Sequence, residues 1–350
     1  SLDANLKKNT GFIKKCKASM GQDNAPQLLR EVKLLRLDKY VSEIVPAAAD
    51  GLLRCKQASD VSAAIDVISA LHARFPATFT VPLITQLLKQ LQPPNIAALT
   101  QMTSEQREKE EQARQAKQKT LLRVVGEMFL GGLLWGIDAI PDGVEGVDRT
   151  EAFMLSFAGA TNSNKAVSKV RDLVKQPGYS VFAGALQNLF VSDREHHLSC
   201  VLAASVAKAF RGDFALAESD SLETAASTVS LAGMQSDTSE HVVTEDMCKR
   251  IKMILQEYCD SAVEHVTSMH KSLLKVRRKA DERLFTKGVV HSEVKEKLER
   301  HERSFDRLAE SVRLLCESLA REPPHLENAA DDGDQLGISF DAPAAPARKW

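Results

Sequence analysis

Residues 34 to 75 read LLRLDKYVSEIVPAAADGLLRCKQASDVSAAIDVISALHARF, and their apolar side chains recur at the three- and four-residue steps of two consecutive amphipathic helices. Pro46 predicts a kink in the first helix or the loss of its first turns. The second helix is expected to begin at an N-cap Ser59 and to stop before Pro76. Since neither helix can bury its stripe alone, we expect the second stripe to lie between them: Val61, Ala64, Ile65, Ile68, Leu71, His72 and Phe75.

Helix signals continue on both sides of this pair. Further helices are expected at residues 2–18, after Pro82, after Thr103, at about 150–160, 165–175 and 178–190, and after Ser192. Thr103 and Gln106 have the spacing of a capping box, in which two side chains satisfy the first backbone amides of a helix. Ser192 and Glu195 have the same spacing. The helix after Thr103 is charged at first and apolar over residues 121–129, so one half should project and the other should pack.

The C-terminal third predicts a long antiparallel helical hairpin with a short turn. Its last helix carries a heptad seam at Val294, Leu298, His301, Phe305, Leu308, Val312, Leu315 and Leu319. The partner helix, at about 245–286, carries Met247, Ile251, Ile254, Tyr258, Ala262, Met269 and Leu273. Gly288 fits the end of the first helix and Ser292 the N-cap of the second.

These patterns, with hardly any strand signal, predict an all-α fold. We expect a HEAT-like stack of antiparallel helical hairpins that ends in the long hairpin. One all-helical domain is expected over residues 1–322, with mobile loops near 138–150 and 211–243. Residues 323–350 are acidic and rich in Ala and Pro, which predicts a disordered linker.

Composition and charge narrow the classes of protein. The net charge of −1 gives no bulk attraction to nucleic acid or membrane, so such a role needs a local patch. No apolar run approaches the roughly 20 residues of a membrane span. The six cysteines lie far apart without a CxxC pair, which predicts buried free thiols in a reducing compartment.

The histidines do not predict a metal site. His196 and His197 are neighbours, so on a helix their side chains diverge by about 100°, whereas helical metal pairs use i,i+4 spacing. His265 and His270 are five residues apart. Two histidines lie on apolar stripes and are expected to be packed: His72 and His301. Since no phosphate-binding loop or nucleophile motif is present either, the sequence predicts neither a cofactor nor an enzyme.

One cationic segment is the candidate contact for RNA or an acidic partner. It comprises Lys271, Lys275, Arg277, Arg278, Lys279, Arg283 and Lys287. Helical spacing places Lys271, Lys275 and Arg278 along one edge, in line with Glu282. The alternative is a solvated helix end, where the macrodipole favours cations. Without an interleaved row of aromatic residues, sequence-specific RNA recognition is not expected.

Four segments carry a resemblance to a known family. They are LDKYVSEIV (37–45) with the later ALHARF (70–75), SLDANLKKNTGFIKK (1–15), DREHHLSCVLAASVAKAFRGD (193–213), and the hairpin from Ser272 to Leu319 with its FTKGVVHSE turn. In family order and over most of residues 1–320, they resemble the first middle domain of the up-frameshift suppressor 2 family, also called regulator of nonsense transcripts 2. The domain type is named after the middle domain of initiation factor 4 gamma.

The resemblance implies a non-catalytic scaffold module in nonsense-mediated mRNA decay. In that family the whole protein bridges the up-frameshift RNA helicase and the up-frameshift 3 protein on the exon-junction complex, through regions outside this chain. It further implies contacts with other decay proteins such as the associated kinase, a cytoplasmic or perinuclear location, and a monomer that needs no membrane. The alternative is an RNA- and helicase-binding module of the translation-initiation type, whose basic edge would hold RNA weakly.

Overall fold

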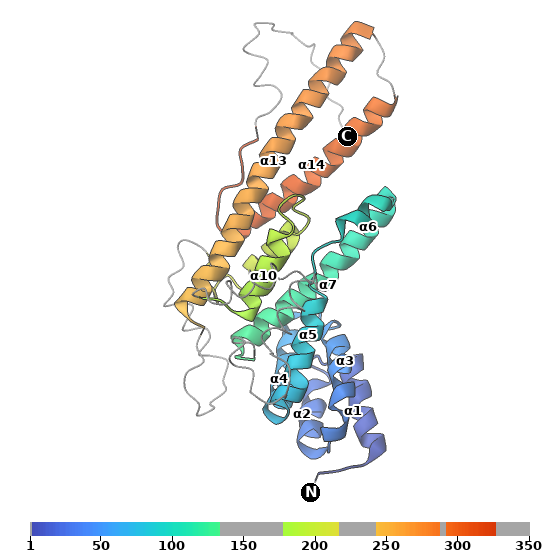
Figure 1. The fold of residues 1–350 in the computed structure, drawn as a ribbon, viewed down its shortest axis with the longest axis vertical. Helices are drawn as coiled ribbons and strands as arrows, with labels where there is room; N and C mark the ends of the chain where they lie inside the picture. The colour runs from blue at the N-terminus through green and yellow to red at the C-terminus, as the bar shows by residue number, and fades with distance from the viewer. Residues whose placement is uncertain (1, 134–177, 217–242, 288–291, 327–350) are drawn as a thin grey trace, which may run out of the picture.

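A computed structural model describes residues 2–133, 178–216, 243–287 and 292–326. Every regular element in these segments is helical, which confirms the all-α prediction. The helices form an elongated molecule with the N terminus at one end and the tip of a long hairpin at the other (Figure 1). Several expectations lie outside the described residues, namely those for 138–150, 150–160, 165–175, most of 211–243, Gly288 and nearly all of 323–350.

The N-terminal part is a stack of short helices. They are α1 (Leu6–Ala18), α2 (Ala25–Leu34), α3 (Val41–Leu52), α4 (Ala58–Arg74) and α5 (Val81–Lys89). α1 packs on α3, α2 on α4, and α3 on α5, so alternate helices share a layer as in HEAT-like stacks. Pro76 ends α4 as predicted, and a π-helical turn follows over Pro76–Thr80.

The two helices predicted within residues 34–75 are present as α3 and α4, with corrections at their boundaries. α4 begins one residue before the predicted cap: its N-cap is Gln57, whose side chain makes no capping hydrogen bond. α3 runs through Pro46, which points to solvent. Leu71 is fully buried as predicted, whereas Ile65 is only half-buried at the edge of the stripe.

A tight contact joins α1 to α3. Gly51 lies against the backbone of α1, where a Cβ atom would sit 1.9 Å from the carbonyl oxygen of Cys16. A residue without a side chain is therefore needed at this crossing.

α7 (Ser104–Leu130) is the spine that joins the N-terminal stack to the rest of the molecule (Figure 1). The predicted capping box is formed: the Gln106 amide donates to Thr103 Oγ1 (3.3 Å) and the Thr103 amide to Gln106 Oε1 (3.2 Å). The C-terminal half of α7 is buried against α4, α10 and α11, while its N-terminal half is exposed beside the short α6 (Ile96–Gln101), as predicted. The Arg307 guanidinium still pairs with Glu108 on the exposed half (2.8 Å).

The second predicted capping box is wrong. α10 (Val181–Val191) has Ser192 as its C-cap, and α11 (Cys200–Ala209) begins only after a turn. Within that turn the Asp193 carboxylate accepts a hydrogen bond from the Ser199 amide (2.6 Å), so the aspartate organises the start of α11 instead. Capping-box spacing cannot reveal this, because the buried turn is fixed by tertiary contacts.

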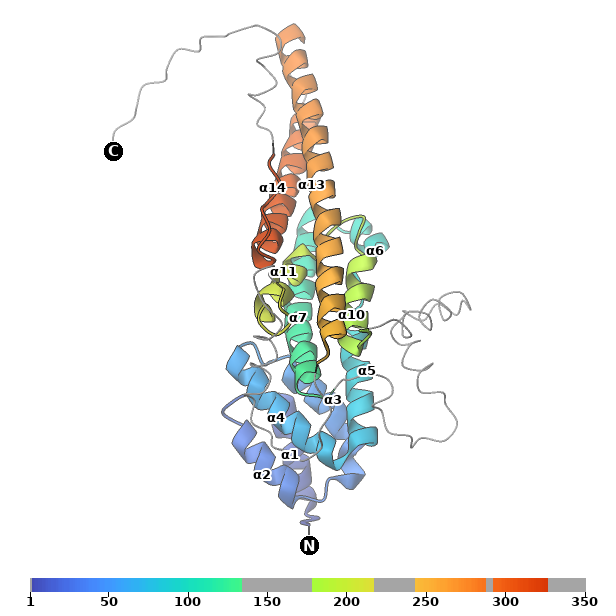
Figure 2. The ribbon, with the colours of Figure 1, turned by 90° about the vertical axis from the view of Figure 1, so that its left-hand side faces the viewer.

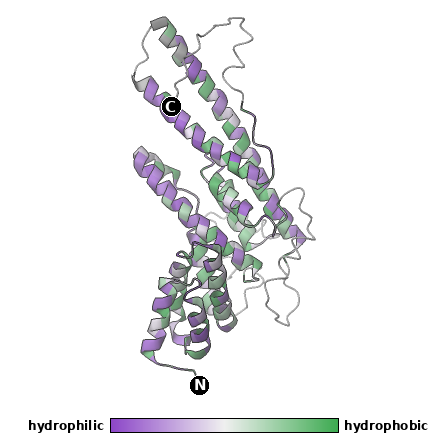
Figure 3. Cartoon of the chain, turned by 180° about the vertical axis from the view of Figure 1, so that it is seen from behind, coloured by the Kyte–Doolittle hydropathy of each residue, from purple (hydrophilic) through white to green (hydrophobic). Residues whose placement is uncertain are grey.

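The C-terminal hairpin consists of α13 (Glu245–Lys287) and α14 (Ser292–Ser318), which lie side by side in Figures 1 and 2. Phe305, Val312, Leu315 and Leu319 of the heptad seam are buried, as predicted. His301 is exposed, so its expected packed position is wrong. The base of the hairpin is buried: Cys259 Sγ lies 3.6 Å from Cys316 Sγ, and α11 packs on α14. Figure 3 shows that the outer half of α7 is largely hydrophilic, whereas α10 is largely hydrophobic.

All six cysteines are buried free thiols, as predicted. No helix in the described part of the chain is long and apolar enough to cross a bilayer.

Candidate functional site

The predicted cationic segment forms the outer half of α13. Its described side chains are exposed: Lys271, Lys275, Arg277, Arg278 and Lys279. Arg277 points across the hairpin and pairs with Glu302 of α14. The side chains of Arg283 and Lys287 lie outside the described residues. The described cations thus form a short edge near the hairpin tip. Arg277 is not part of this edge, because it pairs with Glu302 within the hairpin.

Phe285 extends this edge, and sequence reasoning missed it. Its side chain is 91% exposed, and it lies three residues beyond Glu282, in line with Lys275 and Arg278. The sequence pattern could have predicted this exposure, because Phe285 falls outside the stripe of buried residues that contains Leu273 and Ala280. The cationic edge therefore ends in one solvent-facing aromatic ring.

A second basic segment is α1, which carries Lys7, Lys8, Lys14, Lys15 and Lys17, and carboxylates pair with three of these lysines. Lys15 pairs with Glu31 (2.5 Å), and Lys8 pairs with Asp3 (2.6 Å). A longer pair joins Lys17 to Asp50 (3.7 Å). α1 is therefore a weaker candidate than α13 for binding an anion.

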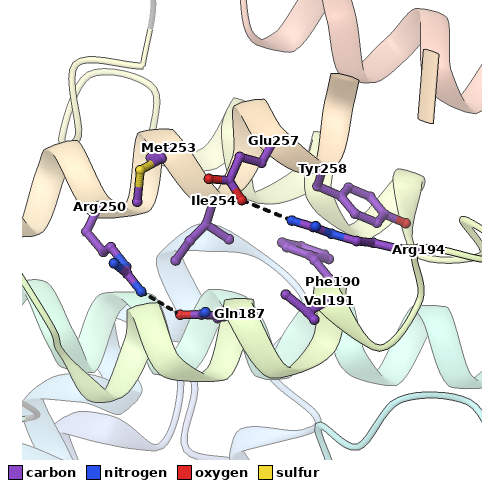
Figure 4. A pocket seen from close by; sticks show the side chains of 9 residues that line it. All are labelled: Gln187, Phe190, Val191, Arg194, Arg250, Met253, Ile254, Glu257 and Tyr258. Atoms are coloured by element: carbon purple, nitrogen blue, oxygen red, sulfur yellow. Dashed lines mark hydrogen bonds and ion pairs between the residues drawn. The ribbon is translucent and has the colours of Figure 1, made fainter. Parts of the chain in front are cut away.

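A small pocket opens between α10 and α13, with a volume of about 130 Å³ (Figure 4). The rings of Phe190 and Tyr258 stack at 4.7 Å on one side of it. Val191 and Met253, which are 48% and 41% exposed, also line it. A cavity of this volume is smaller than the roughly 300–1,000 Å³ of a small-molecule site and has room for one side chain.

Two arginines also line the pocket, and each bonds to a polar side chain, so the wall is partly apolar and partly polar. Figure 4 shows Arg194 reaching to Glu257 and Arg250 to Gln187. The distance from Arg194 Nη2 to Glu257 Oε2 is 2.9 Å, and that from Arg250 Nη2 to Gln187 Oε1 is also 2.9 Å. Arg194 therefore shares its charge with a carboxylate, whereas the Gln187 amide leaves the charge of Arg250 uncompensated at this contact.

A buried polar cluster lies behind the pocket. Asp193 is 1% exposed, and its Oδ2 accepts hydrogen bonds from the Tyr258 hydroxyl (2.7 Å) and the Ser199 amide (2.6 Å). Burial, together with the neighbouring Cys200 and Asp193, raises the pKa of Tyr258. The hydroxyl therefore stays protonated and acts as a donor that fixes the carboxylate.

The adjacent histidines lie in the turn before α11 and not on a helix, so the helical placement assumed for them is wrong. His196 is exposed, and His197 is buried with a left-handed backbone (φ 52°). His197 Nδ1 lies 3.2 Å from His265 Nδ1, and its Nε2 lies 3.0 Å from Ser261 Oγ. Burial first, and His265 second, lower the pKa of His197 to about 4. This ring is therefore neutral at pH 7, and no local sequence pattern reports its contact with His265, which is 68 positions away.

The structure also locates His72 and shows how the metal-ligand residue types are arranged. His72 is half-buried, and its Nδ1 lies 2.7 Å from Thr80 Oγ1, in line with the expected packed position. Among the residues that the structure describes, no group of three His, Cys, Asp or Glu side chains is arranged to hold a metal ion.

Comparison with known proteins gives a consistent result. Residues 6–135 match the MIF4G domain family. The chain is 25% identical over 332 residues to nonsense-mediated mRNA decay protein 2 of Saccharomyces cerevisiae, covering 95% of this chain and 26% of that protein. It is 22% identical over 340 residues to the human regulator of nonsense transcripts 2, covering 97% of this chain and 22% of that protein. A shorter match, 33% identical over 141 residues, is to decay protein 2 of Schizosaccharomyces pombe, covering 38% of this chain and 13% of that protein.

Two solved structures share the fold. The N-terminal mIF4G domain of S. cerevisiae Upf2 aligns with a TM-score of 0.67 at 23% identity, covering 93% of this chain and 91% of that one. The first MIF4G domain of human UPF2 aligns with a TM-score of 0.57 at 20% identity, covering 93% and 86%. The chain spans about a quarter or less of the length of the curated relatives that it matches. Residues 6–135 thus match the MIF4G domain family, and almost the whole chain is similar to the first MIF4G domains of Upf2-type proteins, the regulators of nonsense transcripts 2.

Proposed function

We propose that the chain is a non-catalytic scaffold module of a nonsense-mediated mRNA decay factor. The observation that carries this proposal is the sequence similarity to decay proteins along more than nine-tenths of the chain. In this proposal the chain acts as a monomer, in the cytoplasm or around the nucleus. The full-length protein bridges the up-frameshift helicase and the up-frameshift 3 protein in mRNA surveillance, with the associated kinase and the exon-junction complex as further partners.

The architecture suits a scaffold because its function would need surfaces held at fixed positions. α7 is packed into both the N-terminal stack and the α10–α11 pair, and α11 packs on the hairpin. Interlocked helices of this kind keep distant surfaces at a constant separation, as in other helical repeats.

A chimeric protein tests the proposal. In S. cerevisiae, the matching region of decay protein 2 would be replaced by this chain, and the half-life of an mRNA with a premature stop codon would be measured. We expect rapid decay to be retained. A control chimera carries Leu71→Ala, which opens a cavity in the core. With this variant the reporter mRNA should have a longer half-life. A well-folded, expressed chimera that leaves the reporter fully stable contradicts the proposal.

The exposed cationic edge favours weak RNA binding as a second function. Lys271 and Lys275 are exposed on α13, and contacts to phosphate release counterions and so depend on salt. We expect Lys271→Glu with Lys275→Glu to weaken binding of a single-stranded RNA and to flatten its dependence on salt concentration. Lys7→Glu with Lys14→Glu on α1 is the matched control. Equal RNA affinity of the parent and both double variants would contradict RNA binding by the α13 edge.

A further inference from the structure

The pocket between α10 and α13 has the size of one side chain. Its volume of about 130 Å³ is close to that of a protein cavity of roughly 150 Å³ that accepts benzene. The stacked rings of Phe190 and Tyr258 offer an aromatic wall, against which another ring can pack. Val191 and Met253 leave apolar surface that an extended peptide would cover.

The positive charge of Arg250 at the pocket favours an acidic residue next to the side chain that enters the pocket. Arg194 is paired with Glu257, but Arg250 bonds to the neutral Gln187 amide. A carboxylate that approaches Arg250 gains a charge-assisted hydrogen bond, which is about twice as strong as a neutral one. The pocket therefore fits an aromatic side chain that is followed or preceded by an acidic residue.

The chain itself contains such a sequence. Residues 327–341 read ENAADDGDQLGISFD, with five carboxylates and no Lys or Arg. Its apolar residues, Leu336, Ile338 and Phe340, alternate with small or polar ones, and Asp341 directly follows Phe340. In an extended peptide this alternation puts the three apolar side chains on one side. We propose that this segment docks at the α10–α13 pocket with Phe340 inside it, and that the chain leaves the extended conformation at Asp341, so that the Asp341 carboxylate turns back to pair with Arg250 at the rim.

The described end of the chain makes this docking sterically simple. Arg321 pairs with Asp260 of α13 (2.6 Å), and Asp260 is six residues from the pocket residue Ile254, roughly 9 Å along the helix. The 19 residues from Arg321 to Phe340 can extend up to roughly 60 Å, far more than is needed to pass around one helix.

Because the segment is covalently linked to the rest of the chain, one side chain in the pocket can be enough to hold it there. A side chain in a pocket of this size gives only weak affinity, but a short tether supplies an effective concentration in the millimolar range. A partner's peptide must bind without that advantage, which favours the chain's own segment as the occupant. The inference concerns an internal contact and stands independently of the proposed role in mRNA decay.

Methyl NMR on the full 350-residue chain tests the occupant. We expect Phe340→Ser to change the methyl shifts of Val191, Met253 and Ile254, because the ring current of Phe340 is removed. Ala344→Ser, in the same segment, is the control and should leave those shifts unchanged. Methyl shifts that are the same in the parent and the Phe340→Ser protein overturn the proposal, including the case in which an added acidic peptide then moves them.

A charge exchange tests the pairing. Docking should protect the bond after Phe340 from chymotrypsin, and Arg250→Glu should speed cleavage there about five- to tenfold, the factor expected for the loss of one charged contact. Combining Arg250→Glu with Asp341→Arg should restore protection. Lys249→Glu, one residue away and paired with Glu245, is the control for overall charge. Equal cleavage in all these proteins contradicts the pairing.

Discussion

At the scale of single residues, His197 couples folding to pH. Burial lowers its pKa from 6.5 to about 4, so between these values the unfolded chain binds more protons than the folded one. The stabilising effect of the neutral ring is complete above pH 6.5 and is lost as the pH falls toward 4. We expect the free energy of unfolding, from urea denaturation, to fall by up to about 3 kcal/mol across this window, since each pKa unit corresponds to about 1.4 kcal/mol.

Variants of the two neighbouring histidines separate this effect from general acid sensitivity. His197→Asn keeps a residue that tolerates the left-handed backbone, so it should fold and show a shallower dependence on pH. The slope should not disappear, because burial also lowers the pKa of His265 in contact with it. His196→Asn, at the exposed neighbour, should retain the parent slope; an equal change in both variants argues against His197 as the source.

Tyr258 is the residue that ties the pocket to the buried polar cluster. Tyr258→Phe removes the hydroxyl that donates to Asp193 and leaves a buried carboxylate with one donor fewer. We expect a loss of about 1–3 kcal/mol in the free energy of unfolding. Tyr40→Phe, at a half-buried tyrosine near α3, is the matched control and should change stability by less. Thermal melts of the two variants that coincide contradict the role given to this hydrogen bond.

At the scale of helices, the α1–α3 crossing depends on Gly51. A Cβ atom at Gly51 would collide with the carbonyl of Cys16, and a backbone atom cannot move aside as a side chain can. We expect Gly51→Ala to lower the free energy of unfolding by about 1–3 kcal/mol or more. In contrast, Gly11→Ala in α1 meets nothing within 4 Å and should stabilise the helix by about 0.5–1 kcal/mol. Denaturant unfolding that shows the same sign for both variants would contradict this account of the crossing.

The helices also show which signals could be read from sequence. The Thr103–Gln106 capping box was predicted correctly because both partners are local and exposed. The Ser192–Glu195 pair has the same spacing, but Asp193 is drawn into the interior by Tyr258, 65 residues away, and no local pattern reports that. The seam of α14 was predicted where α13 and α11 cover it, and it failed at His301, nearer the tip, which is exposed.

At the scale of the whole molecule, a candidate site built from contiguous residues could be predicted from sequence, whereas one built from distant helices could not. The cationic edge of α13 could be predicted because charge is a property of contiguous residues. The pocket could not, since its walls come from α10 and α13, which are separated by more than 50 residues. Helical periodicity predicts that a face is buried, but it does not identify the partner helix.

The position of α7 predicts that the two ends of the molecule unfold together. α7 packs against α4 on one side and against α10 and α11 on the other, so a loss of N-terminal packing should be felt at the hairpin. The buried thiols can report this, because burial raises the pKa values of Cys16 and Cys200 to about 12 and makes them unreactive while folded. Labelling by a thiol reagent then measures opening of the structure around each cysteine.

Leu71→Ala in α4 should destabilise the protein by about 2–5 kcal/mol, because Leu71 is fully buried. If unfolding is cooperative, labelling should accelerate by about 30-fold or more at Cys16 and Cys55, and by the same factor at Cys200 and Cys316. Mass spectrometry of the labelled peptides gives each rate. Leu34→Ala, the same change at a leucine that is mostly exposed, is the control and should leave all rates near those of the parent. Acceleration confined to Cys16 and Cys55 would mean that α7 does not couple the two parts, and that residues 1–322 contain two separately folding units.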